Sequence, residues 1–182
     1  MMTKQILATV LMAASCIVVS SASAQPGRSA PPPGCRAWDA DLPSQWAPWA
    51  EKGVAIKAAS TPADAARAAL VVGKKYSVTL APAKDVRMAV ETPAADPPPN
   101  AHKGLLSVRV PSDGLYWVGV TTGLWIDIVE GGAVLESTDH GPGPQCASVA
   151  KSVQFMLKAG NATIQLSDNR GSALDLMVTP HK

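Results

Sequence analysis

The segment at residues 137–146 (STDHGPGPQC) combines an acid, a histidine and a cysteine within ten positions. His140 lies four residues after Glu136, and His102 lies in a separate proline-rich stretch. Two histidines and one carboxylate are the ligand set of a non-haem iron site. The spacing contains no H-x-D/E, HExxH or CxxC motif, so a surface histidine without a ligand is the favoured interpretation and no cofactor is expected. If a metal binds, the predicted ligands are His140, Glu136 and His102.

Cys35 and Cys146 are the two cysteines that follow the N-terminal apolar run. In an exported protein, two such cysteines most simply form one disulfide bond, which here spans 111 positions. The alternative is a thiol that binds metal or acts as a nucleophile, but such a thiol is hard to keep reduced outside the cytosol. We therefore predict a Cys35–Cys146 disulfide, which makes residues 137–146 an anchored rim whose Gly-Pro pairs do not join a sheet.

The first 24 residues have the pattern of a cleaved Sec-type signal peptide. Lys4 is their only charge, an apolar run follows at residues 6–19, and Ala22-Ser23-Ala24 is an A-x-A cleavage site. The run is too short for a transmembrane anchor. Cleavage leaves 158 of the 182 residues, and loss of Lys4 reduces the net charge from +2 to +1. We expect a periplasmic or secreted protein, without the basic patch that nucleic-acid binding needs.

Residues 25–34 form a lead rich in proline and glycine, and we assign residues 35–182 to a single domain. Two short helices are expected at its start. The spacing of Trp46 and Trp49 favours a turn over about residues 43–50 that places both indoles on one face. Residues 60–73 (STPADAARAALVVG) favour a second helix, with a threonine N-cap followed by proline.

From Lys75 onward, apolar residues recur with a period of two. This alternation, with glycine-rich turns, is typical of antiparallel sheets that bury one face. About eight such strands must pair their apolar faces, which predicts an all-β antiparallel sandwich of jelly-roll or immunoglobulin-like type. The predicted strands lie within residues 76–82, 86–91, 105–110, 115–120, 124–137 and 152–179.

Trp117 and Trp125 lie in strands that we expect to be central. Trp117 shares its strand face with Leu115 and Gly119, whereas Trp125 shares its own with Asp127 and Val129. Carbohydrate-binding sandwiches stack sugar rings on exposed aromatic side chains, so both tryptophans are candidate ligand-binding residues. Packing in the core or at a sheet edge is the more common role of such residues.

Four motifs resemble those of a group of short exported bacterial proteins that carry the name homogentisate 1,2-dioxygenase. They are a G-x-Y strand at residues 114–116, W-I-D-I-V at 125–129, H-G-x-G-P-x-C at 140–146, and F-x-L-x-x-G followed by I-Q-L-S at 155–167. The resemblance covers nearly all of the chain after the signal peptide. As the family label says, it implies an iron-dependent oxygenase with Fe(II) held by two histidines and a glutamate.

Three hypotheses on function follow from the sequence. The chain contains no G-x-S-x-G elbow and no glycine-rich phosphate loop, so we assign no catalytic residue. The leading hypothesis is therefore an exported, non-enzymatic β-sandwich that binds a ligand or protein of the cell envelope. The alternatives are the iron-dependent oxygenase and a carbohydrate-binding module.

Overall fold

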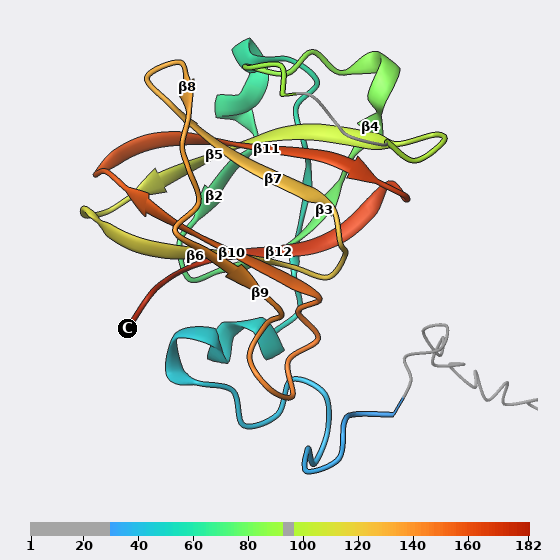
Figure 1. Cartoon of the computed structure of the whole chain (residues 1–182), viewed down its shortest axis with the longest axis vertical. Coiled ribbons are helices and arrows are strands. Elements are labelled where there is room, and N and C mark those ends of the chain that lie inside the picture. The colour runs from blue at the N-terminus through green and yellow to red at the C-terminus, as the bar shows by residue number, and fades with distance from the viewer. Residues whose placement is uncertain (1–29, 93–96) are drawn as a thin grey trace, which may run out of the picture. The chain divides into compact units, whose positions relative to one another are not determined.

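The computed structural model consists of two stacked β-sheets (Figure 1). The apolar residues of the alternating sequence segments are buried between the two sheets. The structure describes residues 30–92 and 97–182. The predicted signal peptide, and most of the lead at 25–34, lie outside the described residues. Contacts among residues 31–182 join them into one unit.

The first sheet forms the lower layer in Figure 1. Its strands follow the order β1 (Val54–Lys57), β3 (Lys75–Thr79), β12 (Ala173–Pro180), β6 (Gly114–Val120), β10 (Lys151–Leu157) and β9 (Asp139–Gly141). The second sheet forms the upper layer. Its strands follow the order β2 (Ala69–Val71), β5 (His102–Val110), β11 (Gly160–Asn169), β7 (Trp125–Glu130) and β8 (Ala133–Val134), with β4 (Ala81–Pro82) also paired to β5. The prediction of an all-β sandwich is confirmed.

The layer between the sheets is closed to solvent and wholly apolar at its centre. Side chains from both sheets that are fully buried there include Val118, Leu176, Leu106, Ile128 and Ile164. Burying one such side chain contributes about 1.5–3 kcal/mol, so the layer is the main stabilising element of the fold. Residues between them in sequence point to the outer faces, the sides of the two sheets that face away from each other.

The expected helices are present as short 3-10 turns rather than α-helices. They are η1 (Ser44–Ala50) and η2 (Pro62–Arg67); a third 3-10 turn, η3 (Ala83–Asp85), was not predicted. Trp46 and Trp49 are both buried on one side of η1, as their spacing predicts, and Pro48 inside the turn removes a backbone donor. No helix in the described residues is long and apolar enough to cross a membrane.

The second expected helix ends early, because its last residues join the second sheet as β2. Leu70 of β2 is buried in the apolar layer, and β2 pairs in parallel with β5. A second parallel pair joins β1 to β3. Neither short edge strand was predicted, so the expectation of about eight purely antiparallel strands was too simple.

The predicted strand at residues 86–91 is absent. Its backbone is held instead by a side chain from β11. The Gln165 carbonyl oxygen accepts hydrogen bonds from the amides of Ala89 (2.6 Å) and Val90 (2.9 Å), and the Gln165 amide donates to the Val90 carbonyl (3.0 Å). These bonds replace those of a strand ladder and hold the segment against the outer face of the second sheet.

The prediction that residues 137–146 do not join a sheet was wrong for their first half. Asp139–Gly141 form β9, which pairs with β10 through the register Asp139↔Gln154 and His140↔Val153. The prolines of the segment, Pro142 and Pro144, come after the paired residues, so they terminate the ladder rather than prevent it.

We predict that Gly119→Ala destabilises the protein by about 1–3 kcal/mol, because a new Cβ at this outer-face position cannot be accommodated. It would lie 2.6 Å from the Trp46 ring and 3.3 Å from Val149 Cγ1. Gly171→Ala is the matched control, since nothing lies within 4 Å of its Cβ position. Denaturant unfolding measures both free energies, and equal stabilities would contradict the packing described for Trp46.

Candidate ligand-binding site

A cavity of about 160 Å³ lies where β7 of the second sheet faces β9 and β10 of the first sheet. Its described lining is Trp125, Ile126, Ser137, His140, Lys151 and Val153. It therefore joins two residues that the sequence had singled out separately, Trp125 as an aromatic ligand-binding residue and His140 as a possible metal ligand.

The strand register explains why His140 reaches this cavity. His140 lies directly opposite Val153, and residues opposite each other in a ladder point to the same side of the sheet. Val153 is buried in the apolar layer, so His140 also points toward the second sheet. His140 itself is exposed, since it lies on the edge strand of the first sheet. Ile126 and Val153 supply an apolar floor.

Trp125 remains 56% exposed, although its ring is fixed in position. Its Nε1–H donates to Asp127 Oδ1 (2.9 Å), two residues along the same face of β7. The Lys151 Nζ lies 5.0 Å from the centroid of the ring, a cation–π contact. A large aromatic surface is thus exposed to solvent in one defined orientation.

Asp127 supports Trp125 rather than offering a free acid. Its side chain is buried on the outer face of the second sheet, and Oδ2 accepts a hydrogen bond from Thr92 Oγ1 (2.9 Å). Oδ1 accepts the Trp125 indole N–H. Both carboxylate oxygens therefore have donors, which satisfies a charge held out of water.

Lys151 and Ser137 are polar residues of the cavity that the sequence did not single out, and Lys151 is the charged one. Its Nζ donates to the Leu124 carbonyl (2.9 Å). Burial lowers the pKa of this amine, and the attraction of the Asp127 carboxylate opposes that shift. The strand pattern could have identified Lys151. It lies two residues before Val153 and four before Phe155, so it shares their face of the strand, which points toward the second sheet.

The predicted metal ligands do not meet. His102 lies in β5 of the second sheet. His140 lies in β9, the edge strand of the first sheet, and Glu136 comes three residues before β9. Residues 30–92 and 97–182 contain no group of three or more His, Cys, Asp or Glu side chains that could hold a metal ion. The residues available do not fit the Fe(II) centre that the family label implies, and no step is assigned to it.

Trp117 lies apart from the cavity, on the outer face of the first sheet. Its Nε1–H donates to His181 Nδ1 (3.0 Å), and the two rings stack at 6.2 Å. Because an indole nitrogen only donates, His181 Nδ1 must accept, and the Gln154 amide 2.7 Å away donates to the same atom. Trp117 also packs against the cluster around Trp46 and is half-buried, so it offers less free ring surface than Trp125.

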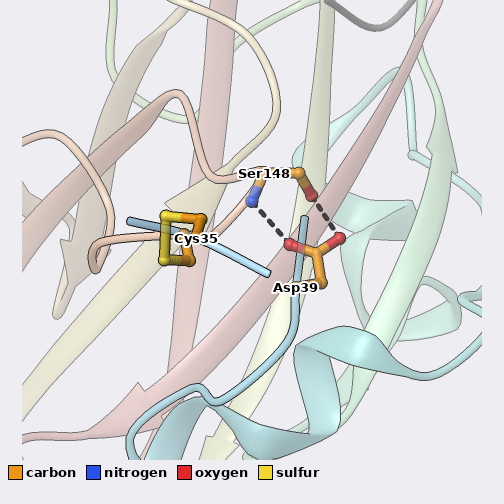
Figure 2. Close-up of a disulfide and its surroundings, with 4 residues drawn as sticks. Cys35, Asp39 and Ser148 are labelled. Carbon is orange, nitrogen blue, oxygen red and sulfur yellow. Dashed lines mark hydrogen bonds between the residues drawn. A yellow bond between two sulfur atoms is a disulfide. The ribbon is translucent and has the colours of Figure 1, made fainter. Parts of the chain in front are cut away.

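The predicted disulfide is present and links Cys35 to Cys146, 111 residues apart (Figure 2). Figure 2 also shows the side chain of Asp39 turned toward Ser148. Asp39 Oδ1 accepts from the Ser148 amide (2.5 Å), and Oδ2 accepts from Ser148 Oγ (2.7 Å). The indole of Trp49 donates to the same Ser148 hydroxyl (2.9 Å). The loop between β9 and β10 is thereby fastened to the N-terminal segment.

No protein-family model matches the chain, and a search of curated proteins finds no similar sequence.

We predict that the Cys35→Ser/Cys146→Ser double variant loses about 2–4 kcal/mol of unfolding free energy, because the unfolded chain regains the freedom of a 111-residue span. Denaturant unfolding of the oxidised, reduced and double-variant proteins measures the loss, and the reduced protein should match the variant. Equal stability in all three forms would contradict a stabilising role for the disulfide.

Proposed function

We propose that this protein is an exported binding protein whose ligand stacks a ring on Trp125 in the cavity beside β9 and β10. The observation that carries the proposal is the exposed but fixed indole of Trp125, with Asp127 holding its edge and Lys151 above its ring. An aromatic side chain in this arrangement offers a large apolar surface next to polar groups, which suits sugars and other ring-bearing ligands.

Fixing the ring before the ligand arrives favours binding. A free surface tryptophan must lose side-chain freedom when a ligand stacks on it, and this loss opposes association. The hydrogen bond to Asp127 and the contact with Lys151 already restrict the Trp125 ring in the free protein. An exposed aromatic surface beside a cavity is also a common mark of a binding site.

The cavity volume limits the size of the ligand. A cavity of roughly 150 Å³ accommodates a benzene molecule, and this one measures about 160 Å³. We therefore propose that one ring enters, as a free small molecule or as a single residue of a longer chain that continues into solvent.

Export to the periplasm or the medium is part of the proposal. It is supported by the signal-peptide pattern of residues 1–24 and by the disulfide, a bond that persists in oxidising compartments. The ligand is then a component of the cell envelope or of the surroundings.

We predict that Trp125→Ala abolishes ring binding, whereas Trp117→Ala retains it. The measurement is tryptophan fluorescence during titration with D-glucose, N-acetyl-D-glucosamine, D-glucuronate and phenylacetate. A saturable change in wild type that is lost only in Trp125→Ala supports the proposal. No response to any of the four probes, or loss of the response in Trp117→Ala alone, would overturn it.

We also predict that the exported protein begins at Gln25, because the A-x-A pattern directs cleavage after Ala24. Intact-mass measurement of the periplasmic and secreted fractions of a bacterial host that expresses the full chain checks this. Uncleaved protein confined to the cytoplasm is the contrary result.

A further inference from the structure

We infer that the ligand of this cavity carries a carboxylate on its ring, which binds between Lys151 and His140. The inference rests on the proposed function and specifies the class of ligand. It follows from the two hydrogen-bond donors that the Lys151 ammonium leaves unused, and from the surroundings of that amine.

Of the three polar side chains Ser137, His140 and Lys151 in the lining, only that of Lys151 is purely a hydrogen-bond donor. The Lys151 ammonium has three N–H groups and gives one to the Leu124 carbonyl. The ring of His140 and the hydroxyl of Ser137 make no hydrogen bond with the described residues, and both line the same cavity. A ligand that satisfies this set must bring acceptor oxygens.

The acids near the cavity hydrogen-bond to other groups. No carboxylate is among the described lining residues. The nearest acid, Asp127, accepts from the Trp125 indole and from Thr92 Oγ1. Beside the histidine, Asp139 Oδ1 accepts the backbone N–H of His140 (2.8 Å). The cavity thus holds a cationic amine and an imidazole without a carboxylate of its own pointing into it.

The position of the amine also favours an anion. Lys151 is partly buried, and this burial disfavours its charged form, as the lowered pKa of its amine reflects. A ligand carboxylate beside Nζ would stabilise the charged form through a charge-assisted hydrogen bond, whereas a neutral hydroxyl would do so much less. The Asp127 charge acts in the same direction but is bound to other donors.

The apolar part of the cavity defines what carries the carboxylate. Ile126 and Val153 form the floor, and Trp125 forms one wall. A ring that binds beside Trp125 lies close to Lys151, since Nζ is 5.0 Å from the centroid of the same indole. The shared chemistry is a ring-bound carboxylate, which either a sugar acid or an aromatic acid can supply.

The test compares acids with neutral partners of matched shape by isothermal titration calorimetry: D-glucuronate with D-glucose, and benzoate with benzamide. We expect at least one acid to bind roughly tenfold or more tightly than its neutral partner, as a hydrogen bond to a charged group predicts. Which pair shows the preference identifies the source as sugar acid or aromatic acid.

Lys151→Met should remove this preference, so that acid and neutral partner bind the variant with equal affinity, since methionine keeps the length of the side chain without its charge. Lys158→Met is the matched control, because Lys158 is an exposed lysine that pairs with Asp113 at another turn (2.9 Å). Its acid preference should equal that of wild type.

The outcomes separate the two proposals. Equal affinity of wild type for acid and neutral partner, with Trp125-dependent binding of both, overturns the carboxylate inference and leaves the proposed function intact. No binding of any of the four compounds overturns both. The wild-type comparison needs no variant, so it decides the inference even if Lys151→Met does not fold.

Discussion

The attachment of the β9–β10 loop to the N-terminal segment is the constraint on which the candidate site depends. The disulfide from Cys35 holds the loop at Cys146, and Asp39 holds it again at Ser148. His140 lies before this loop and Lys151 follows it, so these two polar residues of the cavity are positioned by its two ends. Without this attachment, a loop rich in glycine and proline would leave an edge strand free to separate from its sheet.

The same attachment continues into the first sheet. The indole of Trp49 donates to Ser148, and Lys75 Nζ from β3 donates to the Trp49 carbonyl (3.0 Å). Lys75 Nζ also forms an ion pair with Asp175 Oδ2 of β12, at 3.4 Å. The N-terminal segment therefore lies against the outer face of the first sheet (Figure 1), where Trp46 packs over Gly119. Residues distant in sequence stabilise one end of the sandwich together.

Sequence patterns predicted the parts of the fold that depend on local alternation and on pairs of rare residues. The long strands and the disulfide belong to this class. The patterns failed where a distant side chain decides the conformation. Residues 86–91 alternate like a strand, but Gln165 takes the backbone groups that a strand would use.

The candidate site was predictable only in part, for the same reason. Trp125 could be identified as a strand aromatic that shares its face with Asp127, and His140 as the lone histidine of an unusual loop. That they share a cavity depends on how the edges of the two sheets face each other, which no spacing along the chain encodes. His102 and Glu136 were grouped with His140 by residue type alone, and the topology keeps His102 in the other sheet.

The most direct test of a ligand ring on Trp125 is a two-dimensional ¹H–¹⁵N NMR titration with D-glucuronate and phenylacetate, with the Trp125 indole resonance assigned by Trp125→Phe. The account predicts that this indole N–H and the backbone amides of His140 and Lys151 shift together and saturably with at least one of the two acids. The buried indoles of Trp46 and Trp49 should stay unchanged. Shifts that instead centre on Trp117 and His181, or the absence of any shift at Trp125, would contradict the account.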